Sequence, residues 1–257
     1  EYRDSQKMAS QFEAAFEGKD RYWKQRVQSF PDLSEKEILE DFERMIKDYY
    51  LSTEPSYFRI IYNNSNFQSD FKSYLARLEK KLKTKLSYIH LIDHIQDIPH
   101  LHIQEDLQWL KRLKEHNPEG YIAAKHEFLA KHYHHSQVEL DLLVPRWGED
   151  PSIIDRLVDE TIQHTPSEHN AFEKEREKIM SRLGPLQKKV FAKKLEQARE
   201  FIRLRETMRT YSTRSYYVIR QFALEIGKRW AERGVLDNSD DIFMLKHQEI
   251  RSDAEEN

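Results

Sequence analysis

The sequence contains no cysteine and very little glycine. Without cysteine, the 257 residues can form no disulfide, no zinc–thiolate or iron–sulfur site and no cysteine nucleophile. Only six residues are glycine, where an average usage of roughly 7% would supply three times as many. None of these glycines lies in a phosphate-binding loop of the G-x-G-x-x-G or G-x-x-x-x-G-K-[ST] type, or in a G-x-S-x-G nucleophile elbow. These absences argue against a self-contained kinase or hydrolase.

The sequence also lacks an excess of charge of one sign and any long apolar run. The 42 lysines and arginines are balanced by 45 acidic residues, for a net charge of −3. Nucleic-acid binding needs a clustered cationic surplus, so we expect no nucleic-acid partner. A bilayer-spanning helix needs about 20 predominantly apolar residues, and the first residues, Glu1 to Asp4, lack the pattern of a signal peptide. We therefore expect a cytoplasmic protein that does not contact a membrane.

The residues that are abundant favour helices. Charged residues make up 34% of the chain, and the mean hydropathy is −0.87. A β protein needs many turns, and an α/β nucleotide-binding protein needs glycine-rich loops. Neither requirement can be met with so few glycines. The composition predicts an all-α fold with minimal β structure.

One helix is expected to be unusually long. Between Leu186 and Trp230 there is no proline, and apolar residues recur at helical spacing. At 1.5 Å per residue, a helix over 186–230 is about 65 Å long. A compact domain of this size has a diameter of about 45–50 Å. Either the molecule is elongated, or this helix kinks, for which the Ser212-Thr213 pair is the best candidate.

We expect a single domain with three sub-regions. Residues 1–134 are a helical lead-in, residues 135–151 an irregular crossover, and residues 152–257 the long-helix region. In the lead-in, Ser34 and Glu37 have the spacing of a capping box. Breaks are predicted at 53–55 and at the turn-like run 63–66, and residues 240–245 look extended. The chain begins inside a helical pattern and ends just after a new element starts, which predicts a fragment of a longer multidomain chain.

Arginines are concentrated on the predicted long helix. Arg205, Arg209 and Arg220 share one face by their spacing, so they can converge on an anion. The alternative is a solvated face with internal ion pairs, Glu200 with Arg203 and Glu206 with Arg209. Each such pair contributes roughly 0.2–0.5 kcal/mol when it is exposed.

Two further features could carry chemistry. In the stretch 139–151, acidic and apolar residues alternate, and Arg146 can stack on a neighbour or pair with Glu139 or Asp141. The structural alternative is a crossover whose charges fix a loop. The cluster of histidines at 132, 134 and 135 invites a metal hypothesis, but the H-E-x-x-H spacing is missing. We expect these histidines to be surface or helix-end residues and predict no metal site.

Two motifs together resemble a known family. The first is Glu139-x-Asp141-x-x-x-Pro145-Arg146-Trp147-x-Glu149-Asp150-Pro151, and the second runs from Ala198 to Ile250 and ends in a D-I-F-x-L element that begins at Asp241. Both resemble the phosphoenolpyruvate-synthase-like phosphotransferases, a group that includes the rifampin phosphotransferases. Such proteins combine an ATP-grasp domain, a helical substrate-binding domain and a domain that carries a phosphorylated histidine. This chain resembles the helical part, because the sequences that mark the other two are absent.

The resemblance implies a role in a larger enzyme. ATP and Mg²⁺ would bind the ATP-grasp domain, a phosphohistidine would carry the phosphoryl group, and this chain would hold a small-molecule acceptor. In the antibiotic-modifying members, the basic residues of an R-E-x-x-[KR] turn lie at the acceptor site. That turn corresponds to Arg205, Glu206 and Arg209. The resemblance gives Glu139, Asp141, Pro145, Arg146, Trp147 and Asp241 a structural role. It places no cofactor and no catalytic residue in this chain.

Two observations bear on the acceptor and on the alternative function. Where relatives have a glycine and an arginine ahead of the E-x-D pair, this chain has Tyr133 and His135. We therefore expect an acceptor other than a rifamycin. The alternative is a non-enzymatic helical scaffold that binds a protein partner through an apolar groove, which the 12% aromatic content allows. A concave apolar cavity beside Arg205 and Arg209 would favour the substrate domain, whereas an exposed apolar strip far from them would favour the scaffold.

Overall fold

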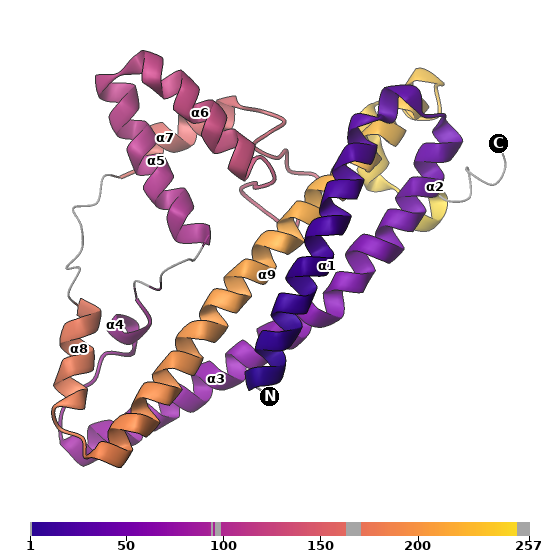
Figure 1. Cartoon of the computed structure of the whole chain (residues 1–257). Helices are drawn as coiled ribbons and strands as arrows, with labels where there is room; N and C mark the ends of the chain where they lie inside the picture. The colour runs from indigo at the N-terminus through magenta and orange to yellow at the C-terminus, as the bar shows by residue number, and fades with distance from the viewer. Residues whose placement is uncertain (1, 94, 96–98, 163–170, 251–257) are drawn as a thin grey trace.

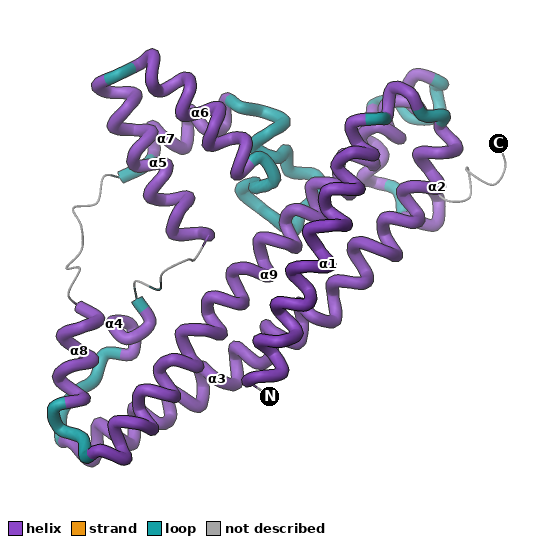
Figure 2. The backbone as a smooth tube through the Cα atoms, in the orientation of Figure 1, coloured by secondary structure: helices purple, strands orange, loops and turns teal. Residues whose placement is uncertain are grey.

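A computed structural model describes residues 2–93, 95, 99–162 and 171–250. In that part of the chain every regular element is helical and no strand occurs (Figure 2), as predicted from the scarcity of glycine. No helix there is long and apolar enough to cross a bilayer. The α-helices are α1 (Tyr2–Gln28), α2 (Glu35–Met45), α3 (Ser52–Leu82), α4 (Tyr88–Ile92), α5 (Pro99–His116), α6 (Pro118–His132), α7 (Ser152–Glu160), α8 (Ala171–Met180) and α9 (Pro185–Glu232). Shorter helical elements are the 3₁₀-helices η1 (Phe30–Asp32) and η3 (Ser239–Met244) and the π-helix η2 (Ile46–Leu51).

The long helix α9 is the axis of the molecule (Figure 1). It runs unbroken for 48 residues through Ser212-Thr213, so of the two alternatives the elongated molecule is the one observed. The hydroxyl of Thr213 donates to the carbonyl of Thr210, 2.9 Å away, which lets the residue stay inside the helix. Helices α1, α2 and α3 pack along α9, and their shared core includes Phe16, Trp23 and Phe222.

The lead-in differs from prediction at two places. The break expected at 53–55 is wrong, because the helix continues through Pro55, which lies inside α3 shortly after the wider π-helical turn of η2. The π-helix η2 joins α2 to α3 without a loop. The turn expected at 63–66 is also wrong. Asn64 is buried inside α3, and its side-chain oxygen accepts a hydrogen bond from Gln68 instead of capping a helix.

Two smaller cores flank the main one. At the lower end of Figure 1, α4 and α8 pack on α3 and α9 around Phe71, Leu91 and Phe191. Helices α5, α6 and α7 form a separate lobe with its own core around Leu110 and Phe128. The sequence also predicts a charged helix that starts at Pro166, and this start lies outside the described residues.

The segment after α9 was expected to be extended, and this prediction is wrong. Residues 239–244 form the 3₁₀-helix η3, which packs against α9. Asp241 accepts a hydrogen bond from the backbone N–H of Asn238 at 2.9 Å, which completes a capping box and starts the helix. Within η3, Ile242 is buried against α9.

Candidate functional site

The crossover 135–151 contains no regular helix, and its own hydrogen bonds hold it in shape. The backbone N–H of Trp147 donates to the carbonyl of His135, and that of Gly148 donates to the carbonyl of Tyr133, both at 2.9 Å. Arg220 of α9 donates to the carboxylate of Glu149 at 2.9 Å and to the carbonyl of Leu142. The crossover is thereby fixed to the long helix.

Arg146 lies inside the crossover and organises it. Its side chain is fully buried, and it donates to the hydroxyl of Ser136 at 2.5 Å and to the carbonyls of Glu139 and Asp141 at 3.0 Å. Of the contacts considered for Arg146, an ion pair with Glu139 or Asp141 does not form, because the guanidinium binds the backbone of these residues instead. Burial lowers the pKa of Arg146. This residue builds the loop and does not face solvent.

The remaining residues of the two motifs are also engaged within the fold. Trp147 is buried in the core of the lobe, where its ring stacks on Phe128 with centroids 5.9 Å apart. The carboxylate of Asp141 accepts from the backbone N–H of Leu143 at 2.9 Å, and Pro145 is exposed ahead of the buried arginine. Asp241 caps η3, as described above.

Arg205 and Arg209 lie together at a cavity of about 610 Å³ between α3, α9 and the start of the crossover. The cavity combines two arginines with amide, hydroxyl and apolar side chains. Its lining residues are Tyr57, Ile61, Asn64, Ser65, Gln137, Val138, Glu139, Leu140, Arg205, Glu206 and Arg209. Arg220 is the third arginine of the predicted face. It is buried, forms an ion pair with Glu149 and does not line this cavity.

Each arginine of the cavity is held by a carboxylate through its Nε. The Nε of Arg205 donates to Glu206 at 2.9 Å, and that of Arg209 donates to Glu139 at 2.7 Å. The expected pair between Glu206 and Arg209 is therefore wrong, whereas the pair between Glu200 and Arg203 forms at 2.7 Å. The two Nη atoms of Arg209, and the Nη1 of Arg205, have no partner among the described residues.

The electrostatics favour the ionised form of both partners in the Glu139 pair. Burial raises the pKa of Glu139, but hydrogen bonds from His135 and Arg209 outweigh it and leave the pKa below its usual value. Burial likewise opposes ionisation of Arg209, but the hydrogen bond to Glu139 outweighs it and raises the pKa of the guanidinium. The pair is a charged clamp at the wall of the cavity.

Sequence reasoning missed several residues of the cavity. Asn64 and Ser65 lie in the stretch that was expected to be a turn, and Tyr57 lies just after the expected break, so none was assigned to a wall facing Arg205. Gln137 comes from the crossover, whose position depends on long-range contacts. No local pattern in the sequence indicates these four residues.

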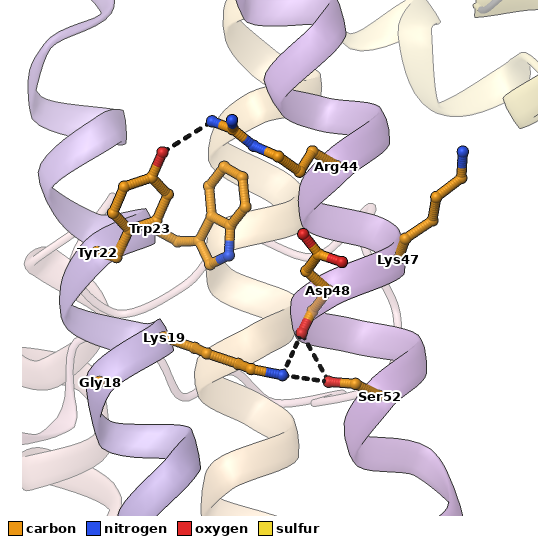
Figure 3. A pocket seen from close by; sticks show the side chains of 8 residues that line it. All are labelled: Gly18, Lys19, Tyr22, Trp23, Arg44, Lys47, Asp48 and Ser52. Carbon is orange, nitrogen blue, oxygen red and sulfur yellow. Dashed lines mark hydrogen bonds between the residues drawn. The ribbon is translucent and has the colours of Figure 1, made fainter.

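A second cavity of about 620 Å³ lies between α1 and the α2–η2 region (Figure 3). It also has cationic side chains, but two of them are bound to protein groups. Lys19 donates to the carbonyl of Asp48 at 2.6 Å and to the hydroxyl of Ser52 at 2.8 Å. Arg44 donates to the hydroxyl of Tyr22 at 2.7 Å. Asp48 also lines this cavity, and its carboxylate opposes the binding of an anion.

In the histidine cluster, His132 is half-buried and ends α6, whereas His134 and His135 follow the helix and are buried. His134 and His135 are 4% and 6% exposed, so the expectation of surface residues is wrong for both, although the helix-end position is correct. Neither ring nitrogen of His134 has a hydrogen-bond partner among the residues that the structure describes. In the described part of the chain, no three His, Asp or Glu side chains lie close enough to hold one metal ion.

Comparison with known proteins gives a family match. The profile of the family described as "Rifampicin phosphotransferase fourth domain" matches residues 65–206, which is more than half of the chain. The chain belongs to this family. The residues that match the family profile include the crossover and Arg205, and the match ends three residues before Arg209. The match confirms the relationship predicted from the two motifs.

Curated relatives of this fourth domain are much longer proteins. Uncharacterized proteins of Mycobacterium bovis and of two strains of Mycobacterium tuberculosis are each 29% identical to it over 117 residues. The aligned region covers 46% of the chain and 12% of each relative. The aligned part of the chain thus spans about an eighth of the length of the relatives it matches.

Proposed function

We propose that this domain binds the acceptor substrate of an ATP-dependent phosphotransferase and presents it to a phosphohistidine on another domain. The parent protein would bind ATP and Mg²⁺ on an ATP-grasp domain and work in the cytoplasm. The observation that carries the proposal is the cavity at which Arg205 and Arg209 meet with free guanidinium nitrogens. A purely linking role would not need such a cavity.

The cavity has the groups that phosphoryl transfer to a small molecule requires. Guanidinium nitrogens donate to phosphoryl oxygens in a planar arrangement, and positioned donors stabilise charge that develops during transfer. The side chains of Asn64, Ser65 and Gln137 can hydrogen-bond a hydroxyl-bearing acceptor. The role of the domain is therefore to position the acceptor and to stabilise the transferring group.

The apolar surroundings favour a substrate domain over a scaffold. Tyr57 and Leu140 line both the arginine cavity and a neighbouring cavity of about 250 Å³, which Phe12, Met208 and Tyr216 also line. Concave apolar surface thus lies directly beside the arginines. An apolar strip remote from them was the feature expected of a scaffold.

The test is a titration of the 257-residue chain with inorganic phosphate, followed through the arginine Hε–Nε signals in NMR spectra. We expect the signals of Arg205 and Arg209 to shift saturably. Arg205→Ala or Arg209→Ala should weaken phosphate binding about tenfold, which corresponds to roughly 1.4 kcal/mol. Arg203→Ala is the matched control, because Arg203 lies on the same helix in a similar ion pair but outside the cavity.

Two results would contradict the proposal. The first is phosphate binding that neither cavity variant weakens. The second is ATP hydrolysis by the chain alone, because the proposal assigns nucleotide chemistry to other domains of the parent.

A further inference from the structure

The two cavity arginines are held in different ways. Arg205 is paired with Glu206, the next residue on the same helix. Arg209 is paired with Glu139, which lies 70 residues earlier in the chain, on the crossover. The side chain of Arg209 is 55% exposed, so little apart from this carboxylate restrains it.

Glu139 is itself held in place. Its side chain is only 15% exposed, and its second carboxylate oxygen lies 2.8 Å from the Nδ1 of His135. His135 is buried, and its ring packs on Trp147 with centroids 5.3 Å apart. A carboxylate that is fixed in this way also fixes the orientation of the guanidinium that donates to it.

The clamp leaves the ligand-binding edge of Arg209 free. Only the Nε is used by Glu139, and both Nη atoms are without a partner among the described residues. A phosphoryl group can therefore be bound by the two terminal nitrogens while Glu139 stays in place. The carboxylate does not need to be displaced by a ligand.

We infer that Glu139 is the positioning residue of Arg209, supplied by the crossover to fix the guanidinium for a phosphoryl group in the cavity. This inference rests on the proposed function. It assigns the E-x-D motif a task at the acceptor site in addition to its place in the loop. His135 acts behind Glu139 by holding the other carboxylate oxygen.

Glu139 has two opposing effects on an anion, and a pair of variants separates them. Its charge repels the anion, whereas its oxygen orients the arginine. Glu139→Gln and Glu139→Met both remove the charge and keep a side chain of similar length. Only glutamine retains an oxygen that can accept from the Nε of Arg209. Any difference between the two variants therefore measures orientation.

The experiment is the phosphate titration described above, with both variants and with wild type. We expect Glu139→Gln to bind phosphate at least as tightly as wild type, because repulsion is removed and orientation is kept. Glu139→Met should bind phosphate about tenfold more weakly than Glu139→Gln, as expected for the loss of one charge-assisted hydrogen bond. The Nε relaxation of Arg209 should report a more mobile side chain in Glu139→Met alone.

Glu200→Gln and Glu200→Met make a matched control pair, since Glu200 binds Arg203 on the same helix. They should not differ from each other in phosphate affinity. If Glu139→Met fails to give the circular dichroism spectrum of wild type, Glu139→Ala replaces it in the comparison.

The outcomes separate this inference from the proposed function. Equal phosphate affinities for Glu139→Gln and Glu139→Met would show that only charge matters and would overturn the inference, while the proposed function would stand. Phosphate binding that is insensitive to Arg209→Ala would overturn the proposed function, and the inference with it.

Discussion

Arg220 and Glu149, 71 residues apart in the chain, form an ion pair of 2.9 Å between the long helix and the crossover. The arginine side chain is 5% exposed and the glutamate side chain 19% exposed. Gln221 donates to the same carboxylate at 2.8 Å. The pair fixes the crossover on α9, and the crossover in turn brings Glu139 to Arg209.

Removal of one partner of the Arg220–Glu149 pair should lower the free energy of unfolding. Arg220→Met leaves the carboxylate of Glu149 partly buried without its cation, and we expect the free energy of unfolding to fall by about 3 kcal/mol. Urea denaturation followed by circular dichroism measures the change. The double variant Arg220→Met/Glu149→Gln should recover part of the loss, because no charge is then left unpaired. A single variant as stable as wild type would show that the pair does not fix the crossover.

Two helical glycines should respond to alanine in opposite directions. A Cβ on Gly227 would lie 2.2 Å from the carbonyl oxygen of Ser239 and 3.0 Å from the Cβ of Ile242. Gly227→Ala should therefore push η3 away from α9 and lower the free energy of unfolding by about 1–3 kcal/mol. A Cβ on Gly18 would meet nothing within 4 Å, so Gly18→Ala should raise the free energy of unfolding by about 0.5–1 kcal/mol.

Thermal unfolding of the two glycine variants tests this contrast, with wild type as the reference. A melting temperature of Gly227→Ala at or above that of wild type would contradict the close packing of η3 on α9.

The free energy of unfolding should decrease as the pH is lowered, because histidines are buried in the folded chain. Burial, and then the nearby charges of His135, Arg214 and Lys24, lower the pKa of His134 well below its ordinary value, and burial lowers the pKa of His132 as well. As the pH falls below about 6.5, the unfolded chain therefore binds more protons than the folded chain. The free energy of unfolding should decrease from there until the pH passes below the folded pKa values.

The measurement is urea denaturation at a series of pH values from 8 to 5. His134→Gln cannot gain a proton and should show a smaller loss of stability between the two ends. His126→Gln, on an exposed position of α6, is the control. A pH dependence that is unchanged in His134→Gln would contradict the assignment to this histidine.

Local patterns in the sequence were sufficient where neighbours in the chain determine the structure. The absence of proline from 186–230 predicted a helix that the structure extends by one residue at its start and two at its end. Ser34 and Glu37 form the predicted capping box, with the hydroxyl accepting at 3.3 Å and the carboxylate at 2.8 Å. Spacing of four residues correctly placed Arg205 beside Arg209.

Predictions from the sequence failed where contacts that form only in the folded chain determine the structure. Asn64 is typical of a turn, but it is buried inside α3 and bonded to Gln68, so its turn preference is not expressed. The helical face predicted for Arg220 was correct, yet the contact with Glu149 removes this residue from the arginine pair. The partner of Arg209 could not be predicted, because Glu139 reaches it only once the crossover has folded.

The most direct test of the central claim is the position of a bound phosphate analogue. Crystals of the chain soaked in tungstate should show an anomalous peak inside the cavity at Tyr57, with the tungstate oxygens about 3 Å from the terminal nitrogens of Arg205 and Arg209. The peak should be weaker in crystals of Arg209→Ala soaked at the same tungstate concentration. A peak only between α1 and α2, at Lys19 and Arg44, or no peak at either cavity, would contradict the account.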